Sequence, residues 1–226
     1  MNPIAGEIVL DAAETRVLGS LVEKQITTPD GYPLSLNALV NACSQSSNRD
    51  PIVAYGEAAV RRAVESLRDR KLAFVFEGAA SRVAKFGHRL NETLGLSPPE
   101  TAALCVLLLR GPQTAGEIRG RTGRLHPFAS LTEVETTLQA LASRAPQPLV
   151  AKLPRQPGRK ESRFAHLLSG QPIAAPPETA PPLEAAPAAG PATDDPVTRL
   201  EQEVAHLRDE LANVKAHLEE LRQRLN

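Results

Sequence analysis

The sequence is poor in aromatic residues. Its 226 residues include no tryptophan, two tyrosines and five phenylalanines. A core without large rings has to be built from leucine, valine and alanine, which suits small helical units better than a large enzyme with a deep pocket. The composition therefore favours one or two small, mainly helical domains.

Cysteine, long apolar runs and a targeting signal are also scarce or missing. The two cysteines, Cys43 and Cys105, have no CxxC partner, so we expect buried free thiols in a reducing cytosol instead of a disulfide or a metal site. The amino terminus lacks the basic and apolar regions of a signal peptide, and no stretch reaches the roughly 18 apolar residues of a membrane span. We therefore expect a cytoplasmic protein without a membrane segment.

The motifs of common enzyme chemistry are absent as well. The sequence contains no phosphate loop, no GxGxxG, no HExxH and no nucleophile elbow. Its five histidines are scattered, and His88 and His166 lie in two similar stretches, KFGHRL and RFAHLL, which indicates a packing role. We therefore expect no enzymatic activity, no cofactor and no metal.

The formal net charge is zero, but the charges are unevenly distributed along the chain. Residues 1–93 carry eleven bases and eleven acids, residues 94–170 carry ten bases and five acids, and residues 171–226 carry five bases and ten acids. A locally basic block can attract a polyanion even when the total charge cancels.

The chain contains an internal duplication. The stretch LDAAETRVL at residues 10–18 aligns with LSPPETAAL at residues 96–104, and both carry a capping residue followed three places on by glutamate. The copies end alike, with the two histidine-containing stretches already quoted. The same apolar stripe lies between these anchors, at Val60, Val64 and Leu67 in one copy and at Val134, Leu138 and Leu141 in the other.

Each copy is predicted to contain three helices and then a β-hairpin. The predicted helices are residues 11–25, 35–46 and 56–71 in the first copy and 97–110, 114–123 and 132–144 in the second; the predicted strands are residues 72–77, 82–88, 149–153 and 162–168. This order is that of the winged helix, a variant of helix-turn-helix. The predicted fold class is therefore mainly α with small β-hairpins (α+β), with two tandem winged-helix domains at residues 9–92 and 94–170.

The last 56 residues differ in composition from both copies. Residues 171–196 include eight prolines and eight alanines and are predicted to form a linker. Residues 197–226 have apolar side chains at a strict 3-4 spacing, which predicts a coiled coil and a parallel homodimer, with higher order left open. An amphipathic helix that docks on its own domains is the alternative. The nine apolar positions are Val197, Leu200, Val204, Leu207, Leu211, Val214, Leu218, Leu221 and Leu225.

Nucleic-acid binding needs lysine or arginine on the contact surface. The third helix of the first copy supplies Arg61 and Arg62 as candidate nucleic-acid contacts, although acidic residues are interleaved with them. The third helix of the second copy begins with two glutamates. The positive charges of the second copy lie around its second helix and in its hairpin, where they form either a phosphate-contacting surface or ordinary solvated charge. They are Arg119, Arg121, Arg124, Arg155, Arg159, Lys160 and Arg163.

The segment between the first and third helices is rich in amides. Asn37, Asn41 and Gln45 exceed what a helix cap and a turn require, and we expect them to form a partner surface. Asn48 and Arg49 follow in the same segment and join the candidate nucleic-acid contacts. The sequence thus favours a protein that binds duplex DNA as an oligomer, with a regulatory role; the alternative is a protein–protein scaffold of tandem winged helices that does not bind DNA.

Three stretches resemble the YceH family of bacterial proteins. They are LDAAETRVLGSLVEKQITTPDGYPLSLNALVNACSQSSNRDP, LLLRGPQTAGEIRGRTGRLHPF and PGRKESRFAHLLSG, within residues 9–170. The resemblance implies a tandem winged-helix fold, often with a coiled-coil tail, and implies no activity, because the function of the family is uncharacterised. Ser46 stands where relatives often carry lysine, which weakens a phosphate-binding role for that segment.

Overall fold

The structure is a computed structural model that describes residues 8–77, 83–156, 158–159 and 161–170. The predicted linker and coiled coil lie outside these residues, and so does Lys160.

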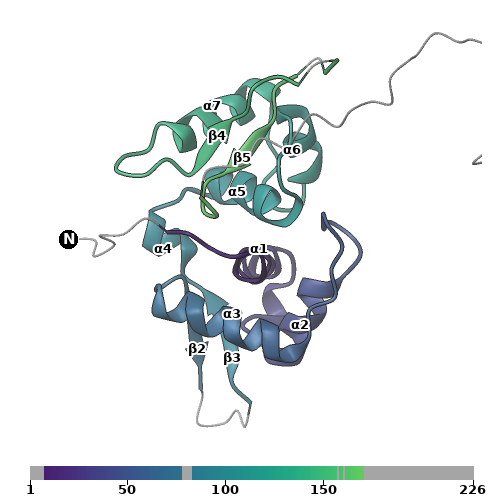
Figure 1. The fold of residues 1–226 in the computed structure, drawn as a ribbon, viewed down its shortest axis with the longest axis vertical. Coiled ribbons are helices and arrows are strands. Elements are labelled where there is room, and N and C mark those ends of the chain that lie inside the picture. The colour runs from purple at the N-terminus through teal and green to yellow at the C-terminus, as the bar shows by residue number, and fades with distance from the viewer. Residues whose placement is uncertain (1–7, 78–82, 157, 160, 171–226) are drawn as a thin grey trace, which may run out of the picture. The chain divides into compact units, whose positions relative to one another are not determined.

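The described chain is mainly α-helical with small antiparallel sheets, which confirms the α+β part of the predicted fold class (Figure 1). Its seven α-helices are α1 (Ala12–Thr27), α2 (Leu36–Ser44), α3 (Glu57–Asp69), α4 (Leu90–Leu94), α5 (Pro98–Arg110), α6 (Ala115–Arg121) and α7 (Leu131–Ala142). The sequence did not predict α4 or the short 3-10 helix η1 (Pro29–Gly31).

The strands form two small sheets. In the first, β1 (Leu34–Ser35) and β2 (Ala73–Phe76) flank the central β3 (Lys85–His88) in antiparallel pairing; in the second, β4 (Val150–Lys152) pairs with β5 (Phe164–His166). Each hairpin strand is shorter than predicted.

The two halves of the described chain repeat the same order of three helices and a hairpin. In both repeats, the residue two positions before the second helix also pairs with the last strand. Leu34 lies opposite Phe86 in the first repeat, and Gln113 lies opposite Phe164 in the second. The duplication read from the sequence is therefore visible in the order and the pairing of the elements.

Helix starts are fixed by local hydrogen bonds. The backbone amide of Asp11 donates to Glu14 at 2.7 Å, and the amide of Glu14 donates to Asp11 at 2.8 Å. Glu100 accepts in the same way from the amide and hydroxyl of Ser97 at the start of α5. These reciprocal bonds satisfy amides that a helix terminus leaves without intrahelical partners, which explains why the capping pattern predicted both starts.

The core is organised around α1, which is buried along most of its length and packs on α2, α3 and α5. Helix α5 is more apolar than α1, and every residue from Thr101 to Leu109 is buried and uncharged. A helix that is apolar on all sides has to be covered on all sides. The first helices of the two repeats cover each other, and the buried residues of both repeats form one hydrophobic cluster.

Gly19 marks the closest approach of α1 and α5. A Cβ atom at this position would lie 2.8 Å from Cδ2 of Leu109 and 3.1 Å from Cβ of Leu108. Since both leucines are buried, Gly19→Val is expected to lower the free energy of unfolding by about 2–3 kcal/mol through overpacking. Urea denaturation followed by circular dichroism measures this.

Gly120 in α6 provides the matched control, because nothing lies within 4 Å of a Cβ atom built there. Gly120→Val should change the free energy of unfolding by less than about 1 kcal/mol. Equal unfolding midpoints for the two variants would contradict close packing of α1 on α5.

Candidate nucleic-acid interface

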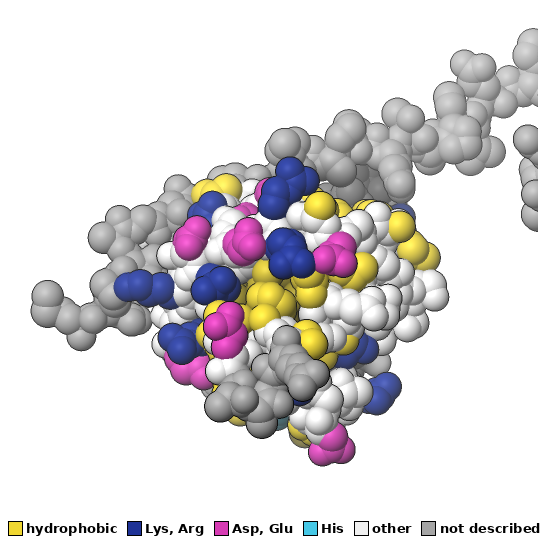
Figure 2. Space-filling model, turned by 90° about the horizontal axis from the view of Figure 1, so that it is seen from below, with side chains coloured by type: hydrophobic (Ala, Val, Ile, Leu, Met, Phe, Trp, Pro, Cys, Tyr) yellow, Lys and Arg dark blue, Asp and Glu magenta, His cyan; other side chains and the backbone are white. Residues whose placement is uncertain are grey.

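The outer face of the first repeat is mixed in charge and apolar at its centre. Figure 2 shows the face at the bottom of Figure 1, which carries α3 and the first hairpin; hydrophobic side chains gather there, and basic and acidic side chains alternate around them. Arg61 and Arg62 are exposed, and Arg61 is paired with Glu57 at 2.8 Å within α3. Phe76 and Ile52 are exposed large apolar residues of this repeat. On this face, the described residues of the repeat therefore present no continuous basic surface.

Arg49 is buried, which corrects its assignment to a nucleic-acid surface. Its side chain is 0% exposed and makes a bidentate contact with Glu23, with Nη2 to Oε2 at 2.7 Å and Nη1 to Oε1 at 3.1 Å. Nη2 also donates to the carbonyl of Ala42 at 2.8 Å. Because the guanidinium is held inside by a buried carboxylate and by the end of α2, it is not available to a phosphate. Asn48 next to it is exposed, with a φ of 56°.

A second buried arginine was not singled out from the sequence. Arg16 of α1 donates to the carbonyls of Cys43 at 3.1 Å and Pro51 at 2.6 Å. Burial, together with the charge of Arg49, lowers the pKa of Arg16 from its usual value. The two arginines fasten the loop between α2 and α3 onto α1. The available signal was the spacing of Arg16 and Glu23, seven positions apart, which puts both charges on one face of α1.

The amide residues predicted as a partner surface do not form one cluster. Asn37 and Asn41 are exposed, one turn apart on α2. Gln45 is half-buried, and its Nε2 donates to the carbonyl of Ser47 at 2.9 Å, so it bridges its own loop.

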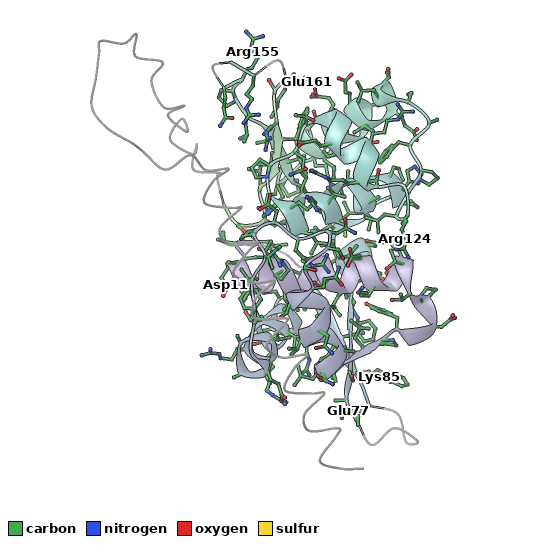
Figure 3. The ribbon with its side chains drawn as sticks, turned by 90° about the vertical axis from the view of Figure 1, so that its right-hand side faces the viewer. Asp11, Glu77, Lys85, Arg124, Arg155 and Glu161 are labelled. Atoms are coloured by element: carbon green, nitrogen blue, oxygen red, sulfur yellow. The ribbon has the colours of Figure 1, made fainter. Side chains whose placement is uncertain are left out.

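The basic residues of the second repeat that were predicted as nucleic-acid contacts lie on three segments: α6, the loop after it and the hairpin β4–β5. Figure 3 shows Arg155 near Glu161 at the tip of this hairpin, with its side chain pointing away from the body, and Arg124 well apart from it. Arg124, Arg155 and Arg159 are exposed, and among the described residues no carboxylate lies within ion-pair distance of them. Arg119 is also exposed, and it donates to the carbonyl of Ala129 at 3.1 Å.

Two of the predicted residues are brought together. Nη1 of Arg121 lies 3.8 Å from Oε1 of Glu117, and Nη2 of Arg163 lies 3.9 Å from the same oxygen. The other oxygen of Glu117 accepts from the backbone amide of Thr114 at 2.9 Å, as part of the α6 cap. We call Arg121, Glu117 and Arg163 the arginine cluster.

The fold holds the arginine cluster in place through backbone pairing. Gln113 and Phe164 exchange hydrogen bonds of 3.0 and 2.7 Å, which attaches the second hairpin to the start of α6. Nη1 of Arg163 donates to the carbonyl of Pro112 at 3.1 Å. The sequence suggested that α6 and the hairpin share a face, and for Arg121 and Arg163 the structure confirms it.

Helix α7 carries no lysine or arginine. Glu133 near its start accepts from the amide of Ala129 at 2.7 Å, and Arg144 beyond its end contacts Glu100 at 3.3 Å and the carbonyl of Leu94. Its exposed residues include Thr132, Glu135, Thr136 and Gln139.

Both cysteines are free and buried, as the sequence predicted. Burial raises the pKa of the Cys43 thiol to about 11 and raises the pKa of Cys105 as well. Within the described ranges, no group of three or more His, Cys, Asp or Glu side chains could hold a metal ion. No helix in the part of the chain that the structure describes is long and apolar enough to cross a membrane.

Comparison with known proteins gives consistent matches. A family model described as "Protein of unknown function, DUF480" matches residues 10–159. A UPF0502 protein of Opitutus terrae is 56% identical over 200 residues, which cover 88% of this chain and 84% of the relative. A UPF0502 protein of Geobacter sulfurreducens is 50% identical over 217 residues, covering 96% and 98%, and one of Chromobacterium violaceum is 46% identical, covering 96% and 92%.

Proposed function

This chain belongs to the UPF0502/DUF480 family, the YceH-like family that its sequence resembles, and from that premise we propose that it binds duplex DNA through the basic surface of its second repeat. The family description names no activity. The support therefore comes from this chain's own residues and their positions.

The proposal treats each repeat as a winged-helix domain. Three helices followed by a hairpin, with a short segment before the second helix paired to the last strand, is the expected arrangement of such a domain. In the second repeat, α6 and α7 then correspond to the helix-turn-helix and the hairpin β4–β5 to the wing. The proposed DNA-binding form is a homodimer paired through the coiled coil predicted for residues 197–226.

The observation that carries the proposal is the convergence of Arg121 and Arg163 on a single carboxylate. Arg124, Arg155 and Arg159 add exposed positive charge without a carboxylate partner among the described residues. Arginine contacts to phosphate supply most of the affinity of non-specific DNA binding. Because α7 lacks a basic side chain, the proposed contact is to the DNA backbone rather than to base edges.

Titration of a labelled random-sequence duplex at about 50 and 200 mM salt tests this. Binding is expected to be weak and salt-dependent, and each arginine–phosphate contact contributes about 0.9 to the slope of log K against log salt. Changing Arg155 and Arg159 together to alanine should weaken binding and reduce that slope. Changing Arg61 and Arg62 in the first repeat is the matched control and should leave both unchanged.

Absence of binding at the lower salt concentration would contradict the proposal and favour a second function, that of a protein–protein scaffold. The specific observation behind this second function is the apolar centre of the first-repeat face (Figure 2). Phe76 and Ile52 are, in addition, exposed large apolar residues of the same repeat. Exposed apolar patches rimmed by polar residues are typical of protein interfaces.

A further inference from the structure

The arginine cluster has the geometry of a site for one anion. We propose that Arg121 and Arg163 together bind a single phosphate of the DNA backbone, which competes for the two guanidinium groups with the Glu117 carboxylate that they face in the free protein. This inference rests on the proposed DNA binding and names the contact that anchors the second repeat on the duplex.

The distances show that neither guanidinium group forms a close hydrogen bond with Glu117. Charge-assisted hydrogen bonds between guanidinium and carboxylate are about 2.7–2.9 Å long, whereas Oε1 of Glu117 lies 3.8 and 3.9 Å from the two arginines. Nη1 of Arg121 is buried and has no hydrogen-bond acceptor within the described part of the chain. A buried donor without an acceptor favours binding of a group that supplies one.

The charges of the cluster leave room for an anion. Two positive charges face one negative charge, and one carboxylate oxygen is already engaged by the cap of α6. The side chains of Arg121 and Arg163 are 30% and 36% exposed, so a ligand can reach them, and both are partly shielded from water. A phosphate group offers oxygens that accept from two guanidinium forks at once.

The same position of the first repeat lacks the site. Counting from the caps Ser35 and Thr114, Ala38 stands where the second repeat has Glu117, and Ala42 stands where it has Arg121. Only the third member has a basic counterpart, because Lys85 precedes Phe86 as Arg163 precedes Phe164. The arginine cluster is therefore specific to the second repeat, and the fold of a repeat does not require it.

The test uses the full chain and a labelled random-sequence duplex. Arg121→Gln and Arg163→Gln should each weaken binding about tenfold, because each removes a charged donor to the phosphate. If both arginines bind the same phosphate, the double variant should lose less than the product of the two single effects. The slope of log K against log salt should fall by about 1.

Glu117→Gln separates this site from a simple salt-bridge network. Glutamine also completes a capping box, so α6 should keep its cap, while removal of the negative charge should tighten DNA binding about threefold. A structural ion-pair network would instead leave binding unchanged or weaken it. Lys85→Gln in the first repeat is the matched control and should bind as the unchanged protein does.

Two outcomes overturn the inference in distinguishable ways. If the unchanged protein binds the duplex and the arginine variants bind equally well, DNA binding stands and the cluster is not its anchor. If the unchanged protein does not bind the duplex, the proposed function fails. Inorganic phosphate at millimolar concentration then shows whether the cluster is a site for the free anion: it would raise the melting temperature of the unchanged protein and not that of Arg121→Gln.

Discussion

Replacement of Arg49 by alanine is expected to lower the free energy of unfolding by about 3–5 kcal/mol, the usual cost of removing one partner from a buried ion pair. The substitution leaves the carboxylate of Glu23, a side chain only 8% exposed, without its bidentate partner. It also removes the donor to the carbonyl of Ala42 at the end of α2. Urea denaturation followed by circular dichroism measures the loss.

Three further variants separate the ion pair from general damage. Arg62→Ala removes an exposed arginine and should change the free energy of unfolding by less than about 0.5 kcal/mol. Arg49→Lys should be destabilising, because an ammonium group cannot form the fork that holds both oxygens of Glu23. The double change Arg49→Met with Glu23→Leu should lose less than Arg49→Ala, because it removes both charges. An Arg49→Ala variant as stable as Arg62→Ala would contradict the buried pair.

The helix positions could be predicted because their causes are local. A cap and its glutamate are three residues apart, and the apolar stripes of α3 and α7 repeat within two turns. The short α4 has no side-chain cap and only five residues, so it left no comparable pattern. Hairpin strands of three or four residues were overestimated because their ends depend on pairing across the sheet.

The burial of Arg49 could not be predicted, because its cause is not local in the sequence. Its partner Glu23 is 26 residues away, in helix α1, and an arginine in an amide-rich loop looks the same whether it faces water or a carboxylate. The packing of α1 on α5 had a signal that went unused. Thr101 to Leu109 contains no charged residue, and a helix without a polar face has to be buried on every side.

The arginine cluster could be predicted in part from the sequence. Arg121 and Arg163 are 42 positions apart, and the predicted fold placed their segments near each other without placing the side chains. Their meeting at Glu117 depends on the pairing of Gln113 with Phe164, two residues with no shared pattern in the sequence. The sequence could therefore suggest a shared basic face and not the geometry of a site.

A second large effect is expected from pH, through His88 at the end of β3. Its side chain is 3% exposed, and its Nδ1 accepts from the backbone amide of Leu90 at 3.2 Å, so the folded protein holds the neutral ring. Burial, opposed in part by the charge of Glu92, lowers the pKa of His88 from 6.5 to about 4. Burial lowers the pKa of His166, at the equivalent place in the second repeat, to about 4 as well.

The sign of the effect follows from which state binds the proton. Between pH 6.5 and about 4 the unfolded chain protonates His88 and the folded chain does not, so stability falls as the pH falls through this window and is fully retained above it. A pKa shift of this size corresponds to a loss of about 3 kcal/mol in the free energy of unfolding from His88 by pH 4.

The measurement is the free energy of unfolding of the unchanged protein and of His88→Gln at pH 7.5, 5.5 and 4.5. Because carboxylates titrate in both proteins, the difference between their free energies of unfolding reports on His88 alone. His88→Gln should be less stable than the unchanged protein at pH 7.5, and this difference in stability should shrink as the pH falls. A difference that stays constant across the three pH values would show that His88 is not held neutral in the folded state.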